Sequence, residues 1–277
     1  MTTQAAPPSP HFNSLGQFFR EVYRRSRVLA VTGWIHAVLL AGMLVISPFD
    51  SRLVLGINPW IKPIKFAISI VIYVWTVAWL LEYLRLSSWA KKIMSWGISI
   101  SMLTEIACIA AQVARGTTSH YNVSTPLDAA IFFIMGAMIA NNTVFVLVLL
   151  IFFLIRSHDV VRPYLWGIRS GLVIFLAASA IGGVMIIHGS HSVDVKDGGP
   201  GLPMVNWSTT GGDLRAAHFL GLHALQVLPI VGFLISRPRS WTTGQKTASI
   251  FAISGVYVLV IGFLYFQAIH GLPLLRR

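Results

Sequence analysis

The chain has 277 residues, of which 55% are hydrophobic and 11% are charged, and its formal net charge is +12. A soluble domain carries about a quarter charged residues, so this composition indicates a membrane protein with several spans. The basic residues stand at the ends of apolar runs, where they indicate how a membrane protein is oriented. The positive net charge therefore does not indicate a nucleic-acid partner, as it would in a soluble protein. Cys108 is the single cysteine, which excludes an intrachain disulfide and a cysteine-ligated cluster.

The first part of the chain is polar and basic. Residues 1–12 are rich in Pro, Ser and Thr, which predicts disorder. Residues 13–27 alternate apolar side chains with arginines, a pattern that fits both a short amphipathic helix on an anionic leaflet and a solvated leader. We assign residues 1–27 to a cytoplasmic basic leader, and we expect no cleaved signal peptide because more spans follow the first apolar run.

Seven apolar runs follow, each close to the length of about 20 residues that crosses a hydrocarbon core about 30 Å thick. They predict an all-α, polytopic transmembrane bundle with spans at about 28–48, 64–86, 93–114, 127–155, 164–188, 215–236 and 247–270. In this interpretation residues 28–270 are one membrane domain and residues 271–277 are a short tail. Lys and Arg are more numerous in the leader and the even-numbered loops, which predicts a cytoplasmic N-terminus and an extracytoplasmic C-terminus in a bacterial inner membrane.

The sixth run opens with an unusually polar stretch. On a helical wheel, Arg215, His218, His223 and Gln226 fall in one sector. Ionisable side chains inside a membrane are costly, so this sector is a candidate functional site. His218 and His223 point about 140° apart, which argues against one metal ion shared by these two residues.

Polar side chains on other spans extend the candidate site. Six of the nine histidines fall near the outer side in the predicted topology: His120, His188, His191, His218, His223 and His270. Polar residues also recur at helical spacing on the second, third and seventh runs. Together with Gln226 they predict a cavity between helices that opens to the outer side and is lined by Lys62, Lys65, Tyr73, Glu105, Gln112 and Gln267.

The favoured interpretation of this cavity is a redox module that holds haem b or a quinone. Neutral imidazoles are common axial ligands in helix bundles, and the general layout is similar to cytochrome-b-type membrane bundles. Arg215, Lys62 and Lys65 are expected to pair with haem propionates. The candidate cofactor-binding residues are His36, His188, His218, His223, His270 and Arg215.

Two alternatives stay open. In the first, the protein is a channel or a proton-coupled carrier, in which Lys62, Lys65 and Arg215 attract an anion while Glu105 and a histidine such as His223 relay protons. In the second, it is a zinc hydrolase whose metal is bound by His188, His191 and His218.

The seven-span layout resembles adiponectin-receptor and haemolysin-III proteins, which implies a zinc site. Those proteins carry a His-x-x-x-His pair near the last span, whereas the pair here is His218-x-x-x-x-His223 in the sixth. The expected partners are the lipid bilayer and another membrane or extracytoplasmic protein, with no nucleic acid.

Overall fold

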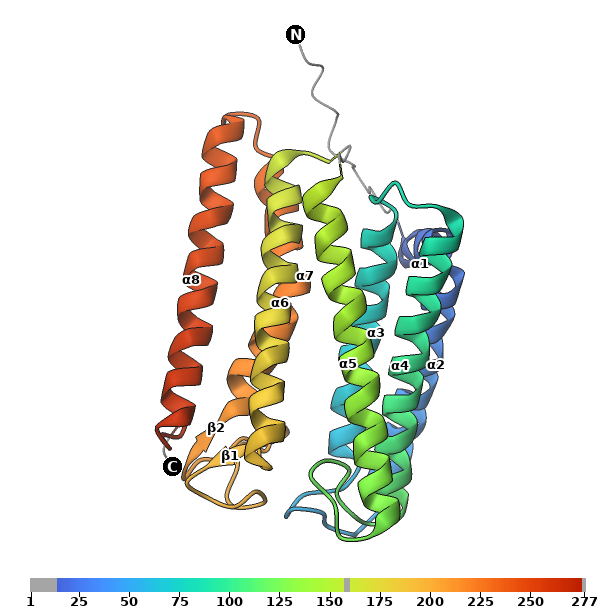
Figure 1. Cartoon of the computed structure of the whole chain (residues 1–277), viewed down its shortest axis with the longest axis vertical. Helices are drawn as coiled ribbons and strands as arrows, with labels where there is room; N and C mark the ends of the chain where they lie inside the picture. Colours follow the sequence, from blue (N-terminus) through green and yellow to red (C-terminus); the bar gives the residue numbers. More distant parts are fainter. Residues whose placement is uncertain (1–13, 157–159, 276–277) are drawn as a thin grey trace.

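The computed structural model describes residues 14–156 and 160–275, so the disorder predicted for residues 1–12 lies outside the described residues. Within these ranges, seven helices are long and apolar enough to cross a membrane, and they run side by side (Figure 1). This confirms the all-α class and the seven predicted spans. The spans are α2 (Arg27–Ile46, extended by the 3-10 turn η1, Ser47–Phe49), α3 (Ile61–Leu81), α4 (Ser88–Ala114), α5 (Pro126–Ile155), α6 (Arg162–His188), α7 (Leu214–Ser236) and α8 (Thr243–Ile269).

Several helices begin earlier than the apolar pattern predicts, because a capping residue starts them in a polar turn. The Thr242 hydroxyl accepts a hydrogen bond from Gln245 N at 3.2 Å, and the Gln245 side chain accepts one from Thr242 N at 2.9 Å. This capping box starts α8. Ser87 caps α4 in a similar way, by accepting from Ala90 N at 3.2 Å.

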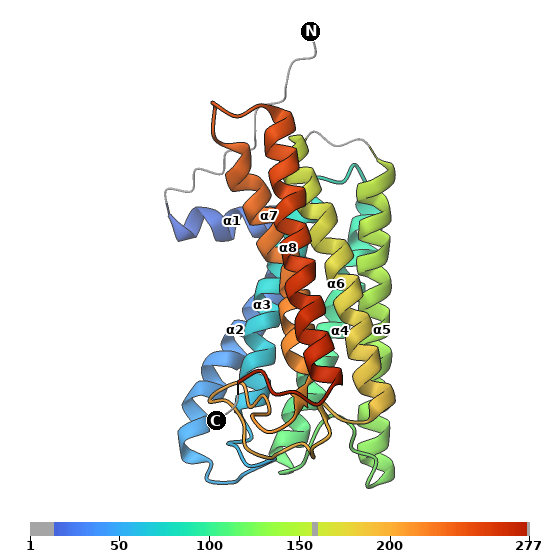
Figure 2. The ribbon, with the colours of Figure 1, turned by 90° about the vertical axis from the view of Figure 1, so that its left-hand side faces the viewer.

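A short helix, α1 (Leu15–Arg25), lies across the bundle rather than along it (Figure 2). Its Val22 is buried, and its Phe18 ring stacks on Trp79 of α3 at a centroid distance of 6.4 Å. The Arg25 guanidinium lies 3.6 Å above the same indole and donates to the Trp79 carbonyl at 2.8 Å. Of the two structures that the sequence allows for this segment, the chain therefore adopts a helix over Leu15–Arg25, which is docked on the bundle.

Helices α6 and α7 pack closely because glycines remove side chains from their contact. A Cβ at Gly171 would lie 2.7 Å from the carbonyl oxygen of Ala224, and one at Gly232 would lie 2.7 Å from that of Pro163. Small residues allow the backbones of membrane helices to approach in this manner. The position of α7, which carries His218 and Arg215, is thereby set relative to α6.

The close packing predicts opposite effects for two glycine substitutions on α6. Gly167→Ala is expected to lower the free energy of unfolding by about 1–3 kcal/mol, because the new methyl group overlaps the carbonyl oxygen of Leu228. Gly183→Ala is the control, since nothing lies within 4 Å of its added Cβ. It should stabilise by about 0.5–1 kcal/mol through helix propensity. Thermal unfolding in detergent measures both, and equal midpoints would contradict this account of the packing.

We call the end of the bundle where the chain ends the C-terminal face (Figure 1). It is built from residues 50–60, 115–125 and 189–213, which connect α2 to α3, α4 to α5, and α6 to α7. The last of these connections, named here the capping loop, contains the antiparallel strands β1 (Ser192–Val193) and β2 (Gly212–Asp213). The N-terminal face is the opposite end, where α1 lies.

Candidate functional site at the C-terminal face

A buried carboxylate, an imidazole and an ammonium group from three elements lie in a row. Lys62 is in the first turn of α3, Glu105 is on α4, and His120 is in the connection after α4. The Lys62 Nζ donates to His120 Nδ1 at 3.1 Å. Because an ammonium group can only donate, the hydrogen of a neutral His120 resides on Nε2, which lies 3.9 Å from Glu105 Oε1.

Glu105 is incompletely paired. The residue is 1% exposed, and no described residue donates a hydrogen bond to its Oε2 atom. A buried polar atom without a hydrogen-bond partner is rare, because burying it lowers the stability of the fold. Such atoms are found at catalytic and transport sites. Glu105 is therefore the chemically most distinctive group of the site.

Asp128, a residue that the sequence analysis did not single out, secures the connection that carries His120. Its carboxylate accepts hydrogen bonds from Gln112 at 2.8 Å, Arg115 at 2.5 Å and Thr125 Oγ1 at 2.6 Å. Gln112, predicted to line the cavity, thus belongs to a structural network between α4 and α5. The sequence signal for Asp128 is the Thr125-x-x-Asp128 pattern, in which Thr125 caps α5.

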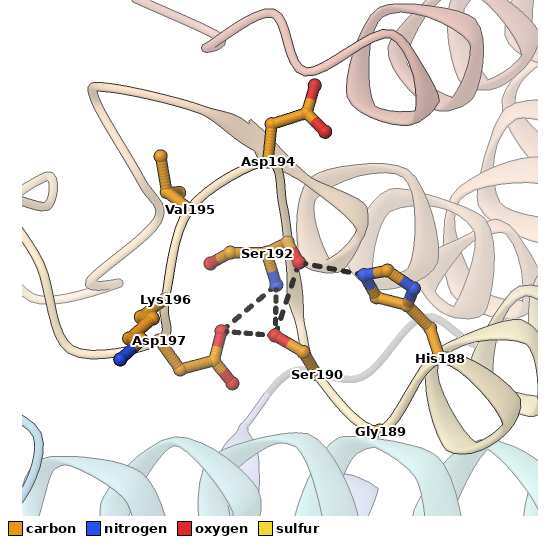
Figure 3. Close-up of a pocket in the computed structure, with 8 residues that line it drawn as sticks. All are labelled: His188, Gly189, Ser190, Ser192, Asp194, Val195, Lys196 and Asp197. Atoms are coloured by element: carbon orange, nitrogen blue, oxygen red, sulfur yellow. Dashed lines mark hydrogen bonds between the residues drawn. The ribbon is translucent and has the colours of Figure 1, made fainter.

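The capping loop contributes a second histidine, which is paired with an aspartate. His191 Nδ1 lies 2.7 Å from Asp197 Oδ2, and since the carboxylate accepts, Nδ1 carries the hydrogen and Nε2 bears the lone pair. Asp197 also accepts from Ser192 N at 3.0 Å and from Ser190 Oγ at 3.0 Å (Figure 3). The His191 ring is 6.3 Å from that of His120 and 4.8 Å from that of Tyr121.

A surface hollow of about 500 Å³ adjoins this pair, and Figure 3 shows its lining. It is formed by His188, Gly189, Ser190, Ser192, Asp194, Val195, Lys196 and Asp197. His188 is exposed, and its Nε2 lies 3.2 Å from the carbonyl oxygen of Ser192. The hollow therefore leads from the surface to the Asp197 side of the His191–Asp197 pair.

His218 supplies the third imidazole, from α7. Its Nδ1 lies 2.7 Å from the carbonyl oxygen of Ala178, so Nδ1 carries the hydrogen and Nε2 is the acceptor. The ring occupies the space left by Gly182, where an added Cβ would lie 2.9 Å from Cε1 of His218. His218 is near enough to His191 and His120 for the charges of these rings to interact. We name the set Lys62, Glu105, His120, His191, Asp197 and His218 the polar cluster.

Burial controls the protonation of the two loop histidines. Burial, together with the nearby Lys62 ammonium, holds the pKa of His120 well below its usual value. Burial also lowers the pKa of His191, although the bond to Asp197 opposes this effect. For Asp197, burial alone would raise the pKa, but the hydrogen bonds from His191 and Ser192 keep it below its usual value.

These shifts predict that the protein loses stability in mild acid. The unfolded chain takes up protons on His120 and His191 near pH 6.5, whereas in the folded protein these rings stay neutral to lower pH. The unfolded state therefore binds more protons below about pH 6.5, and stability falls by about 1.4 kcal/mol per pH unit for each histidine. The lowered pKa of Asp197 adds a loss only below about pH 4. Thermal midpoints between pH 7 and pH 5 measure the slope.

Matched variants separate the contributions to this slope. His120→Gln and His191→Gln should each lower the slope by about 1.4 kcal/mol per pH unit, and His270→Gln, at an exposed position, is the control. A wild-type midpoint that does not change between pH 7 and pH 5 would contradict the assignment of neutral, buried imidazoles.

Two further cations, Lys65 and Arg215, lie beside the polar cluster. Lys65 Nζ donates to the carbonyl of Val205 at 2.9 Å. Arg215 binds Asp213 through Nε at 2.9 Å and donates to the carbonyl of Asn206 at 2.5 Å. Both cations thus hold the capping loop. Of the predicted site residues, the structure therefore brings together Lys62, Lys65, Glu105, His191, Arg215 and His218, and it adds His120 and Asp197.

The remaining predicted residues have other partners. The two ring nitrogens of the buried His36 lie 2.7 Å from the Thr32 carbonyl and 3.3 Å from the Met102 carbonyl. His223 packs edge-on against Phe219, at 4.4 Å between ring centroids. Gln226 lies beside His223, and no described residue donates to its Oε1. The others are separately placed: Tyr73 donates to Asn142, Gln267 donates to Pro273 O, and the exposed His270 contacts Phe266.

The histidines predicted to bind zinc do not assemble into such a site. Among the described residues, no group of three or more His, Cys, Asp or Glu side chains is arranged to hold a metal ion. His188 faces the surface hollow, whereas His191 and His218 belong to the polar cluster. The structure thus separates His188 from the other two.

Comparisons with known protein families, with curated proteins and with solved structures return no match for this chain.

Proposed function

We propose that this integral membrane protein is a proton-coupled carrier that takes up a small solute at its C-terminal face. The observation that carries the proposal is Glu105, a buried carboxylate with one oxygen free of any described partner, beside His120 and Lys62. The hydrogen on Nε2 of His120 can pass to Glu105 while Lys62 Nζ gives a proton to Nδ1, so His120 stays neutral and the charges of Glu105 and Lys62 disappear together. Intramembrane carboxylate and histidine groups are typical components of proton relays.

Buried polar contacts continue along α4 from Glu105 toward the N-terminal face. This path supports transport across the membrane rather than a reaction at the C-terminal face alone. Below Glu105, a ring nitrogen of His36 lies 3.3 Å from the Met102 carbonyl, and Asn141 donates to Ser101 Oγ at 2.9 Å one residue closer to the N-terminal face. Thr32 then donates to Ser99 at 2.8 Å. Ser26 and Ser95 lie 3.0 Å apart toward the N-terminal face, so polar groups follow α4 through most of its length.

The orientation is part of the same proposal. The basic residues of α1 and of the connections at the N-terminal face favour a cytoplasmic location for that face. The polar cluster then opens to the extracytoplasmic side, in a bacterial inner membrane. A reporter fused to the C-terminus checks this: alkaline phosphatase should be active there and green fluorescent protein dark.

A redox role with haem b or a quinone is the second candidate, and His218 favours it. A ligating histidine usually donates its other ring N–H to a carbonyl or carboxylate, as His218 does to Ala178. Its Nε2 could then bind haem iron or a quinone oxygen. His36 has both nitrogens beside carbonyls, so it is a poor second ligand. A Soret band in protein expressed with haem precursor would support haem, and its absence would rule haem out.

Proteoliposomes test the carrier. The lumen contains a pH-sensitive dye, valinomycin and K⁺ clamp the membrane potential, and membrane-impermeant phosphate, succinate, glutamate or gluconate is added outside. We expect at least one solute to change the lumenal pH at a rate proportional to the amount of protein. Rates equal to those of protein-free liposomes for the whole panel would overturn the proposal.

A further inference from the structure

Backbone strain is concentrated around the polar cluster. Among the described residues, the non-glycine residues with positive φ are Leu55, Tyr121, Asp194, Met204 and Asn206. All of them lie in the three connections of the C-terminal face. Side chains with a Cβ disfavour this conformation, and residues held in it gather at ligand clamps and switches. The residues with positive φ therefore gather at the face that carries the polar cluster.

Two of these residues flank Val205 in the capping loop. Met204 has φ 64° and Asn206 has φ 55°, and between them the chain directs two consecutive carbonyls at cations. The Val205 carbonyl accepts from Lys65 at 2.9 Å, and the Asn206 carbonyl accepts from Arg215 at 2.5 Å. The strained backbone thus places two oxygen atoms side by side in front of the two cations.

The Val205 carbonyl is a weak partner for the Lys65 ammonium, whereas Arg215 is also paired with the Asp213 carboxylate. Neither Lys62 nor Lys65 has a carboxylate oxygen within 4.0 Å in the described part of the chain, although both are partly buried. Lys62, Lys65 and Arg215 are also close enough to repel one another. Hydrogen bonds from a cation to a charged oxygen are shorter and about twice as strong as those to a neutral carbonyl.

We infer that residues 201–208 of the capping loop are a plug whose carbonyls occupy the site of an anionic group of the solute. The ligand class is a small molecule bearing a carboxylate or phosphate, whose oxygens displace Val205 and Asn206 from Lys65 and Arg215. This inference rests on the proposed carrier function, because the plug covers the site that the solute enters.

Residues 201–208 of the capping loop form a compact unit with its own hydrogen bonds. Leu202 N donates to the Trp207 carbonyl at 2.8 Å, and Gly201 and Ser208 form a bridge, so residues 201–208 hold their own shape. Gly198, with φ 93°, and Gly211 lie on either side of this unit. Its side-chain contact with the α2–α3 connection is the long bond of 3.5 Å from Asn206 to the Leu55 carbonyl. Four contacts attach it to α3 and α7: Lys65 and Arg215 bind its carbonyls, the Trp207 ring lies 6.0 Å from that of Phe219, and Ser208 N donates to Asp213 at 2.7 Å.

Distances between two spin labels test the plug. The labels are attached at Met204→Cys and Leu127→Cys, both exposed positions at the C-terminal face, in a Cys108→Ser background. The full chain is placed in phosphatidylcholine nanodiscs. We expect inorganic phosphate or succinate to produce a second, longer distance in a saturable manner. Phosphatidylglycerol nanodiscs without free phosphate form the arm that distinguishes a lipid headgroup from a soluble anion.

Two lysine variants provide the control. Lys65→Met should populate the longer distance at least fivefold more than the wild type without any anion, and should raise the half-saturating phosphate concentration at least tenfold. Lys92→Met, an exposed residue of α4 at the N-terminal face, should change both by less than twofold. Distances that are unchanged by both anions and by Lys65→Met would overturn the plug. Proton movement without displacement refutes the plug alone, and displacement without proton movement refutes the carrier alone.

Discussion

Exchange of Glu105 for glutamine is expected to abolish proton movement while leaving the protein folded. The amide cannot accept and release a proton near neutral pH, so the solute-dependent change of lumenal pH should fall by about 100-fold or more. Stability should stay equal or rise, because the variant removes a buried ionisable group whose Oε2 atom has no described partner. Lumenal dye fluorescence and thermal unfolding of the same preparation measure the two effects.

Glu82→Gln is the matched control for this prediction. Glu82 lies at the N-terminal face, where it pairs with Arg24 at 3.3 Å and Lys91 at 3.4 Å on the surface. Its replacement should cost less than about 1 kcal/mol and leave proton movement within twofold. If Glu105→Gln kept the wild-type rate, or if Glu82→Gln lost it, Glu105 would not be the proton-exchanging group.

Asp128→Ala is expected to cause the largest loss of stability, about 3 kcal/mol in the free energy of unfolding. The carboxylate is 3% exposed and accepts from Gln112, Arg115, Ser124 and Thr125. Without it, the buried amide nitrogen of Gln112 loses its acceptor, and the guanidinium of Arg115 loses its ion pair and keeps the hydrogen bond to Gln112 Oε1. Because the same connection carries His120, proton movement should fall as well. Thermal unfolding and the liposome assay measure both effects.

Two further variants serve as controls for the Asp128→Ala prediction. Asp194→Asn, at an exposed position with positive φ that asparagine accepts well, should change stability by less than about 0.5 kcal/mol. The double variant Asp128→Ala, Arg115→Met should recover part of the loss, because it removes an unpaired cation together with its partner. A double variant less stable than Asp128→Ala would show that Arg115 is held by other groups.

Part of the site follows from the sequence. The apolar periodicity locates all seven spans, and the cost of burying charge singles out Lys62, Glu105, Arg215 and His218, which the structure places together. Asp197 was not predicted as a site residue because it lies in a loop, where a carboxylate is ordinarily solvated. His120 was placed at the outer side, but nothing in its neighbours along the chain indicated its contacts with Lys62 and Glu105.

The sequence by itself determined the membrane class, the number of spans and the concentration of histidines toward one end, because span length and hydrophobicity are local properties of the chain. Only the tertiary structure decided which histidines meet. His218 joins the polar cluster through the close packing of α6 and α7, whereas His223, on the same helix, turns toward Phe219. The rotation of each helix and the path of each connection depend on packing between distant segments, and these decide the partners of every polar side chain.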